Sequence, residues 1–419
     1  MKINRGFSIP VVDISKDCFR QSVVDREPGL YLGHPTTVML DDNHTIIAVY
    51  PKCHGNGQIC MKKSLDGGWT WSERLPVHAS WSTSMEVPTI FKTYDKNGKS
   101  HLIMFSGMYP ARMSLSEDNG NTWSELAPIG DFGGLVTMAD LCNTAPGEYM
   151  AYFHDDGRFI KVETLFCRST VYATGTGADR RTRVTHSYSD DGGKTWSPEE
   201  ENWIFAEDRP GDKWEKIHES FSEKSNNQFT IYQTKSTDGG LTWGEPQAIC
   251  RPDADYVHPS EPGVIRSPDG KQLAMLLRED SRKHNSQLLI SNDNSQTWEG
   301  PYEMQGALTG DRHCARYLKD GRIFISFRDN CLETPTEGDW VGWVGTYDDI
   351  VNRREGQYRV RIMENFNGCD CAYPGVIIMP DGTIVTTTYG HWTPGEKPYI
   401  VTVHVHPDDL DAKYRALVK

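Results

Sequence analysis

Four side chains that can bind ions or move protons recur at one position of a repeated hairpin. Each lies eight residues before a turn aspartate, in the pairs His34 and Asp42, Glu261 and Asp269, Arg312 and Asp320, and Tyr373 and Asp381. A strand-like run joins the two positions, and a second such run follows the turn. A single buried Arg or Tyr is more often a satisfied structural residue, but four polar types at equivalent positions indicate a site.

The second strand of each hairpin supplies another set of polar side chains. They lie eight or nine residues beyond the same aspartates and are Tyr50, Arg278, Arg328 and Tyr389. Antiparallel strands joined by a turn bring their far ends side by side. We therefore expect both sets at one mouth of the scaffold that carries the hairpins.

That scaffold is indicated by a second repeat, Ser-x-Asp-x-Gly-x-Thr-Trp. It occurs at residues 64–71, 116–123, 189–196 and 236–243, and a copy at 291–298 has lost its glycine. The Asp carboxylate accepts backbone N–H bonds, the Gly supplies a positive φ, and the Trp packs between sheets. These carboxylates are therefore expected to be structural rather than catalytic.

The spacing of about 50 residues and the short β-rich runs predict an all-β fold, a six-bladed β-propeller of four-stranded antiparallel blades. Its first-strand hairpins begin near residues 34, 86, 135, 261, 312 and 373. Repeats from about 30 to 405 predict one domain over 1–419, with an insertion in blade three at 160–228 that serves as a lid or a dimer contact. Residues 346–349 are interpreted as a degenerate box, and residues 399–405 close the last blade with an N-terminal strand.

The boxes, with Ala-Tyr-Pro-Gly-Val at 372–376 and Ser-Glu-Pro-Gly-Val at 260–264, resemble the sialidase superfamily, whose propellers hydrolyse terminal acidic sugars. The resemblance implies that Tyr373 attacks the anomeric carbon and that Glu261 is its base. It also implies that arginines grip the substrate carboxylate, namely Arg278, Arg312 and Arg328. The chemistry is coherent, because a phenol with a pKa near ~10 needs a base and guanidinium groups bind carboxylates bidentately.

Two departures from that family concern blade one. Its Phe-Arg-Ile-Pro motif is replaced by Leu-Gly-His-Pro at 32–35, and residues 50–60, where an acid Asp is expected, contain no carboxylate. Lys52 is proposed as a carboxylate partner and His54 as the proton donor, since histidine titrates near neutrality. Further substrate contacts are expected from His34, from Glu86 facing the channel and from Trp392 stacking on a sugar.

Composition limits the partners. The net charge is −14 without a basic cluster, so no nucleic-acid partner is expected, and no apolar run reaches the ~20 residues of a membrane span. The ten cysteines are expected to be mostly free thiols, and Cys369-x-Cys371 is too tight for a zinc pair, so neither metal nor cofactor is expected. The N-terminus lacks a signal-peptide core, which predicts a cytoplasmic protein, or a secreted or periplasmic one after removal of a signal peptide. A propeller's sides suit monomers and dimers alike.

These features predict an exo-acting glycoside hydrolase that cleaves a terminal acidic sugar, a sialic acid or a related ulosonic or uronic acid. One alternative is a uronate-directed polysaccharide lyase that uses Tyr and His to abstract a proton. The other is a non-catalytic glycan-binding propeller. An unsaturated product would identify the lyase, and saturable binding without turnover would identify the binding protein.

Overall fold

The computed structural model of the chain describes residues 6–55, 57–160, 164–176, 180–189, 193–204, 209–225, 229–252, 256–330 and 334–419. The chain forms two compact units. The first comprises Met1–Asp155 and Phe229–Lys419, and the second is Asp156–Gln228.

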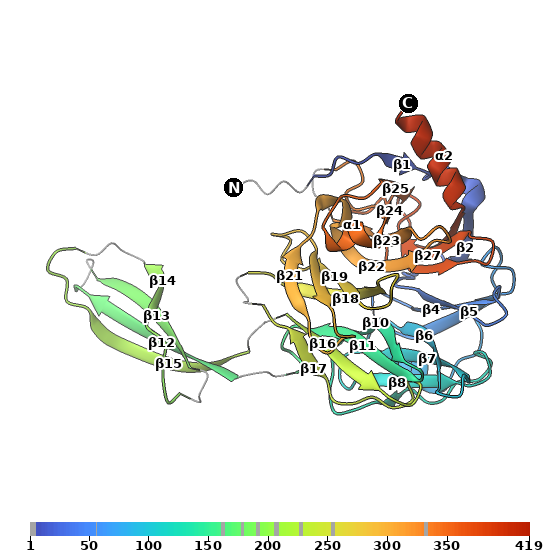
Figure 1. The fold of residues 1–419 in the computed structure, drawn as a ribbon. Coiled ribbons are helices and arrows are strands. Elements are labelled where there is room, and N and C mark those ends of the chain that lie inside the picture. The colour runs from blue at the N-terminus through green and yellow to red at the C-terminus, as the bar shows by residue number, and fades with distance from the viewer. Residues whose placement is uncertain are drawn as a thin grey trace. The chain divides into compact units, whose positions relative to one another are not determined.

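The first unit consists of β-sheets arranged as blades (Figure 1). Blade one contains β3 (Thr36–Met39), β4 (Ile46–Pro51) and β5 (Ile59–Ser64). Blade two contains β6 (Thr89–Tyr94), β7 (Ser100–Ser106), β8 (Arg112–Ser116) and β9 (Ala127–Pro128). Blade three contains β10 (Leu135–Ala145), β11 (Glu148–Asp155), β16 (Thr230–Ser236) and β17 (Gln247–Cys250).

The remaining blades follow the same antiparallel order. Blade four contains β18 (Pro259–Arg266), β19 (Leu273–Glu279), β20 (Gln287–Ser291) and β21 (Glu299–Glu303). Blade five contains β22 (Gly310–Tyr317), β23 (Ile323–Asp329), β24 (Trp340–Gly345) and β25 (Tyr358–Met363). Blade six contains β26 (Gly375–Ile378), β27 (Ile384–Gly390), β28 (Tyr399–Val405) and, from the start of the chain, β2 (Gln21–Asp25).

The first strands of the blades form a closed ring. Each of β3, β6, β10, β18 and β22 contacts the next first strand in chain order, and β26 contacts β3. The described residues therefore form a six-bladed propeller, which confirms the predicted fold class. Two blades differ from the four-stranded expectation, because blade one has three strands in the described residues and blade five gains β1 (Val11–Asp13) beside β25.

The boxes have the structural role that their sequence predicts. In blade two, Thr122 N donates to Asp118 Oδ1 at 2.9 Å and Gly120 N donates to Ser116 Oγ at 2.9 Å. The Trp123 indole packs edge-on against Trp81, with ring centroids 5.1 Å apart. The predicted degenerate box at 346–349 is wrong, because Thr346 instead caps the short helix α1 (Tyr347–Val351).

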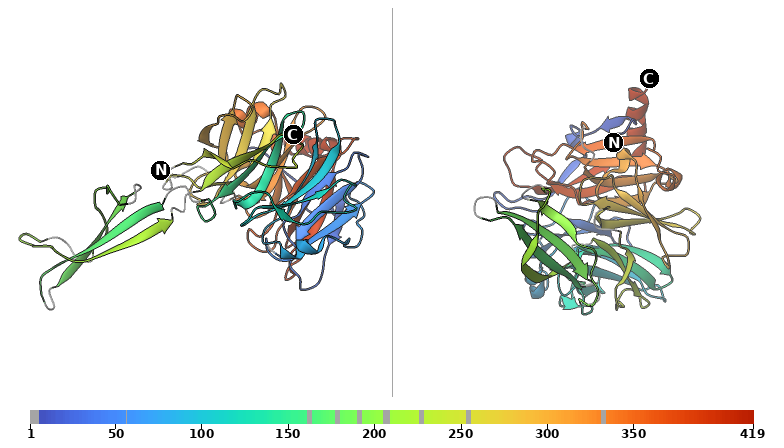
Figure 2. Two further views of the ribbon diagram at one scale, coloured as in Figure 1. Left: turned by 90° about the horizontal axis from the view of Figure 1, so that it is seen from below. Right: turned by 90° about the vertical axis from the view of Figure 1, so that its left-hand side faces the viewer.

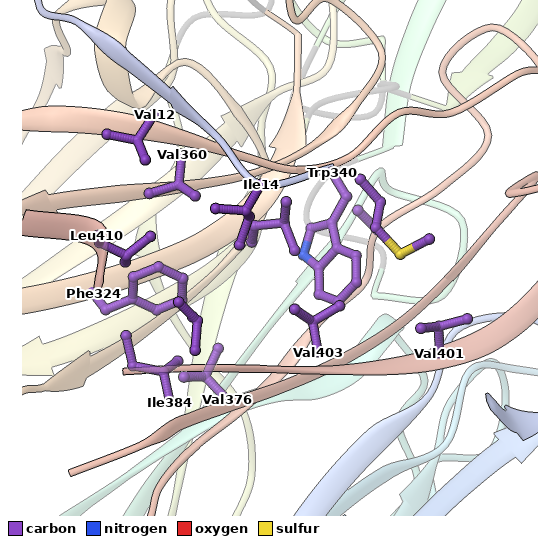
Figure 3. Close-up of a cluster of buried hydrophobic side chains, with 14 of the residues drawn as sticks. Val12, Ile14, Phe324, Trp340, Val360, Val376, Ile384, Val401, Val403 and Leu410 are labelled. Carbon is purple, nitrogen blue, oxygen red and sulfur yellow. The ribbon is translucent and has the colours of Figure 1, made fainter. Parts of the chain in front are cut away.

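A large apolar core lies between blades five and six (Figure 3). Trp340 and Phe324 from blade five meet Val403 from blade six. Val12 on β1 and Leu410 on helix α2 (Pro407–Leu417) join the same cluster, so both ends of the described chain are packed onto these blades. Short 3-10 helices lie at Cys18–Arg20, Ala79–Thr83 and Gly306–Leu308.

The second unit is a four-stranded antiparallel sheet in the order β14, β13, β12, β15 (Figure 2). Its strands are β12 (Thr164–Thr174), β13 (Arg181–Ser189), β14 (Glu200–Ile204) and β15 (Glu215–Ser225). In the chain it falls between β11 and β16, two neighbouring strands of blade three, and it encloses the segment predicted as an insertion. A lid or dimer role for it stays a prediction.

Two further observations concern the chain as a whole. No helix in the described part of the chain is long and apolar enough to cross a membrane. The cysteines that the structure describes are free thiols, and Cys331 lies outside the described residues.

Candidate active site

A left-handed backbone residue marks the start of several first strands. His34, Glu261 and Arg312 have φ values of 52°, 49° and 58°, a region that residues with a Cβ rarely occupy. The pairing register slips beside Glu261 and Arg312, which re-aims the side chains as a β-bulge does. In blade six the left-handed residue is Ala372 (φ 56°). Tyr373 therefore lies one residue after the left-handed position that His34, Glu261 and Arg312 occupy, although the spacing predicts one equivalent position for all four.

Tyr373, Glu261 and Arg278 form one hydrogen-bonded group. The Tyr373 hydroxyl donates a short hydrogen bond to Glu261 Oε1. Arg278 Nη1 donates to the same carboxylate oxygen at 2.8 Å and to the Tyr373 hydroxyl at 3.2 Å. The spacing argument expected these three side chains at one mouth of the channel, and the structure brings them together.

The electrostatics prepare this group for proton transfer. Burial, reinforced by the charge of Glu261, raises the pKa of Tyr373 above its ordinary value, so the phenol is neutral at neutral pH. Burial alone would raise the pKa of Glu261, but the Arg278 and Arg328 charges and the Tyr373 hydrogen bond outweigh it and lower that pKa. Glu261 is therefore an ionised acceptor in contact with a protonated phenol.

Asp311 is a buried carboxylate that sequence reasoning missed. It is fully buried and binds three arginines: Arg282 through both carboxylate oxygens at 2.6 and 2.9 Å, Arg328 Nε at 2.8 Å and Arg278 Nε at 3.5 Å. Burial opposes its ionisation, yet the Arg328 and Arg278 charges hold its pKa well below the usual range. The available signal was its place next to Arg312 at the start of a first strand.

The arginines predicted to bind the substrate carboxylate differ in whether their N–H donors already have partners. Arg328 is occupied, since it binds Asp311, donates to Cys369 O at 2.7 Å and covers the Tyr373 ring at 5.4 Å. Arg312 is 8% exposed and lines a pocket with Thr37 and Arg316. Among the described residues the Arg312 guanidinium makes no hydrogen bond or ion pair, so its donors are open to a ligand.

Two histidines lie beside the nucleophile candidate. The buried His34 ring packs edge-on against Tyr373, with centroids 4.6 Å apart, and its Nε2 lies 3.1 Å from the Tyr389 hydroxyl. Burial lowers the pKa of His34 well below its usual value, so the ring is neutral, and its Nδ1 has no partner in the described part of the chain. The His54 ring packs against that of His34, with centroids 4.8 Å apart, and most of the His54 side chain is exposed.

Asp370 is a second carboxylate that sequence reasoning missed. It accepts from the Tyr31 hydroxyl at 2.6 Å and from the Tyr389 hydroxyl at 3.3 Å, and its other oxygen lies 3.0 Å from His391 Nε2. Burial is opposed by the Tyr31 and His391 hydrogen bonds, and the net effect lowers the pKa of Asp370. It lies three residues before Tyr373 in blade six, whereas the resemblance places the acid in blade one.

Other predicted residues lie elsewhere. Trp392 is 7% exposed and packs against Trp340 in the core, so sugar stacking by Trp392 is not supported. The hydroxyl of Tyr50 is occupied, because it donates to Asp25. The backbone of Lys52 pairs with that of Leu32 just after β4 ends. The described residues contain no group of three or more His, Cys, Asp or Glu side chains arranged to hold a metal ion.

Glu86 is buried at the start of blade two and accepts a short hydrogen bond from the backbone N–H of Val136. Burial raises the pKa of Glu86 to about 7, and backbone hydrogen bonds only partly offset the burial. An acid with a raised folded pKa stabilises the fold below its unfolded pKa of ~4.3 and loses this contribution as pH rises through the folded value.

We therefore expect wild type to lose roughly 3 kcal/mol of unfolding free energy from this group between pH 5 and pH 8. Glu86→Gln should flatten that part of the profile, because the amide does not ionise. Urea unfolding at both pH values measures it, with the exposed Glu125→Gln as the control. An unchanged slope in Glu86→Gln would show that Glu86 is already ionised at pH 5.

Comparisons with solved structures agree on the fold. A protein of unknown function from Dyadobacter fermentans is 14% identical, with a TM-score of 0.54, and the match covers 92% of this chain and 97% of that one. The Hadza microbial sialidase Hz136 is 12% identical, with a TM-score of 0.53, over 90% of this chain and 66% of that one. Identities this low establish a shared fold and nothing about activity.

Sequence comparison gives the family. No curated protein matches this chain. The BNR repeat-like domain matches residues 106–386, which is more than half of the chain, and this span contains blades three to five. The chain is a divergent, sialidase-like propeller that belongs to the BNR repeat-like domain family.

Proposed function

We propose that the protein is an exo-acting glycoside hydrolase that cleaves a terminal acidic sugar, a sialic acid or a related ulosonic or uronic acid, with Tyr373 as the nucleophile. The observation that carries this proposal is the buried hydrogen bond from the Tyr373 phenol to the ionised Glu261 carboxylate. A neutral phenol approaches an anionic sugar without repulsion, and the adjacent carboxylate supplies the base that a phenol requires.

The first step forms a covalent intermediate. The Tyr373 oxygen attacks the anomeric carbon while Glu261 takes the phenolic proton, and the bond from that carbon to the leaving oxygen breaks. His54 gives a proton to the leaving oxygen. Arg278 donates to both Glu261 and Tyr373, so it holds the pair together as the proton moves.

The second step releases the sugar. Water attacks the anomeric carbon and gives a proton to His54, and the bond from that carbon to the Tyr373 oxygen breaks. Glu261 returns its proton to the departing phenolate, which restores the starting state. Both steps keep the number of protons and bonds balanced, with one water consumed for each glycosidic bond cleaved.

Arg312 is the best candidate for binding the sugar's carboxylate. The charges of Arg278, Arg282 and Arg328 are matched by three carboxylates, those of Glu261, Asp280 and Asp311. Arg312 has no carboxylate partner in the described part of the chain. A guanidinium without an internal partner can form a planar, bidentate pair with a ligand carboxylate.

We expect Arg312→Met to lower kcat/KM for the acidic glycoside by about 100-fold, the loss of a charged hydrogen-bonded pair. The unfolding free energy should stay the same or rise, because the substitution removes a buried cation that lacks a partner. Kinetics and urea unfolding measure the two effects. The exposed Arg353→Met is the matched control, and a parallel loss of stability and activity would contradict this role for Arg312.

The test of the proposal is a panel of aryl glycosides of sialic acid, other ulosonic acids, uronic acids and neutral sugars. Release from one acidic member supports the proposal and names the sugar. A product that absorbs in the near ultraviolet through a new double bond would instead identify the lyase. Saturable binding of an acidic sugar without any product would identify a glycan-binding propeller.

A further inference from the structure

A chain of three side chains links the exposed His54 to the half-buried carboxylate of Asp370. His54 Nδ1 lies 2.7 Å from the Tyr31 hydroxyl, and that hydroxyl donates to Asp370 Oδ1 at 2.6 Å. Tyr31 and His54 come from blade one and its entry, whereas Asp370 lies on the segment that leads into Tyr373. The nucleophile and this chain are thus held by one stretch of backbone.

The hydrogen-bond directions fix where His54 carries its proton. An ionised carboxylate only accepts hydrogen bonds, so Tyr31 must give its single proton to Asp370. The Tyr31 oxygen can then only accept from His54, which requires a proton on His54 Nδ1. The second ring nitrogen, Nε2, is therefore the one that can gain or lose a proton during a reaction.

Asp370 has further partners besides Tyr31. The Tyr389 hydroxyl donates to the same oxygen, Oδ1, at 3.3 Å. The second oxygen lies 3.0 Å from His391 Nε2, which is also 3.2 Å from Asn367 Nδ2. The two hydroxyl donors and the lowered pKa of Asp370 keep it an acceptor for the Tyr31 proton.

We propose that Asp370 and Tyr31 are positioning residues that orient the His54 ring and lock it in the Nδ1–H tautomer, so that His54 Nε2 supplies the proton to the leaving group. This inference rests on the proposed function. It adds a carboxylate that acts through a phenol, where the interval in blade one offers no carboxylate of its own. Neither positioning residue needs to touch the substrate.

The groups that face His54 are few in the part of the chain that the structure describes. They are Tyr31 and Asp370 on one side and the neutral His34 ring on the other, with Tyr389 and His391 one contact further away. Asp370 is the nearest carboxylate to His54, with its Oδ1 3.7 Å from His54 Nδ1, and it contacts that nitrogen through the Tyr31 hydroxyl.

The test compares Asp370→Asn and Tyr31→Phe with wild type on two glycosides of the same sugar. One has an alkyl leaving group that needs a proton, and the other has a dinitrophenyl group that leaves without one. We expect each variant to lose about 100-fold in kcat/KM on the alkyl glycoside and less than about 3-fold on the dinitrophenyl glycoside.

The matched control is Tyr358→Phe, which removes another phenol that donates to an aspartate at 2.7 Å, namely Asp411 on helix α2, an element that supplies no residue of the proposed site. It should leave both rates unchanged. Equal losses on the two glycosides in Asp370→Asn would show a purely structural role and overturn the inference, as would wild-type rates in both site variants.

A second measurement does not require turnover. Nitrogen-15 NMR of labelled histidine, with His54 assigned from the spectrum of His54→Gln, reports which ring nitrogen carries the proton. We expect the Nδ1–H tautomer in wild type and a mixture in Tyr31→Phe. An Nε2–H tautomer in wild type would overturn the inference even if no glycoside is cleaved, whereas inactivity with the Nδ1–H tautomer would count against the proposed function alone.

Discussion

Tyr373→Phe is expected to lower kcat on the cleaved glycoside by at least about 10³-fold, with the fold unchanged. The substitution removes one oxygen, which is the atom that would form the covalent bond to the sugar. Glu261 keeps its hydrogen bond from Arg278 at 2.8 Å, so the buried carboxylate is still paired. The measurement is steady-state release of the aryl group, together with a thermal unfolding curve.

The control for this variant is Tyr152→Phe, which removes a buried hydroxyl that lies 2.9 Å from Ser295 Oγ within the propeller. It should retain wild-type kinetics. The affinity of Tyr373→Phe for the product sugar should be close to that of wild type, because the phenyl ring still fills the site. Activity that survives the loss of the hydroxyl would rule out a tyrosine nucleophile.

Asp311→Ala is expected to lower the free energy of unfolding by about 3–5 kcal/mol. The carboxylate is fully buried between Arg278, Arg282 and Arg328, and its removal leaves buried cations without their counter-ion. Urea unfolding followed by tryptophan fluorescence measures the change. The exposed turn carboxylate of the same blade gives the control, because Asp320→Ala removes a surface pair with Arg322 and should cost less than about 1 kcal/mol.

The Asp311 effect should also depend on pH. Since the folded pKa of Asp311 lies below its ordinary value, its contribution is present above the unfolded pKa of ~3.9 and is lost as pH falls further. The difference between wild type and Asp311→Ala should therefore shrink in acid. A constant difference from pH 7 to pH 3 would mean that Asp311 acts through packing and not through charge.

The parts of this fold that local rules determine were predictable from the sequence. The boxes are built from contacts within eight residues, so their turns and the positions of the blades follow from the pattern. The approach of Tyr373 to Glu261 also followed, because first strands of a ring repeat one geometry. The box predicted at 346–349 failed because Thr346 and Asp349 satisfy a helix cap equally well.

The internal pairing of charges was not predictable in the same way. Asp311 binds arginines of blades four and five, and Asp370 binds residues that lie more than three hundred positions earlier or about twenty later. Such contacts depend on side-chain direction after a bulge, which spacing along one strand does not give. The spacing predicted the same role for Arg328 and Arg312. Only their hydrogen-bond partners distinguish Arg328, which is bound to Asp311, from Arg312, whose donors are open to a ligand.

The order in which the blades are completed has a consequence for synthesis. Blade six joins β2, near the start of the chain, to β26, β27 and β28, and β1 pairs with β25 of blade five. During translation the first strands emerge long before their partners, and the ring cannot close until Val405 has left the ribosome. Until then β2 lacks its partner, and β1 lacks its own until β25 ends at Met363, so both edges are open to wrong pairing during most of the elongation between them and their partners.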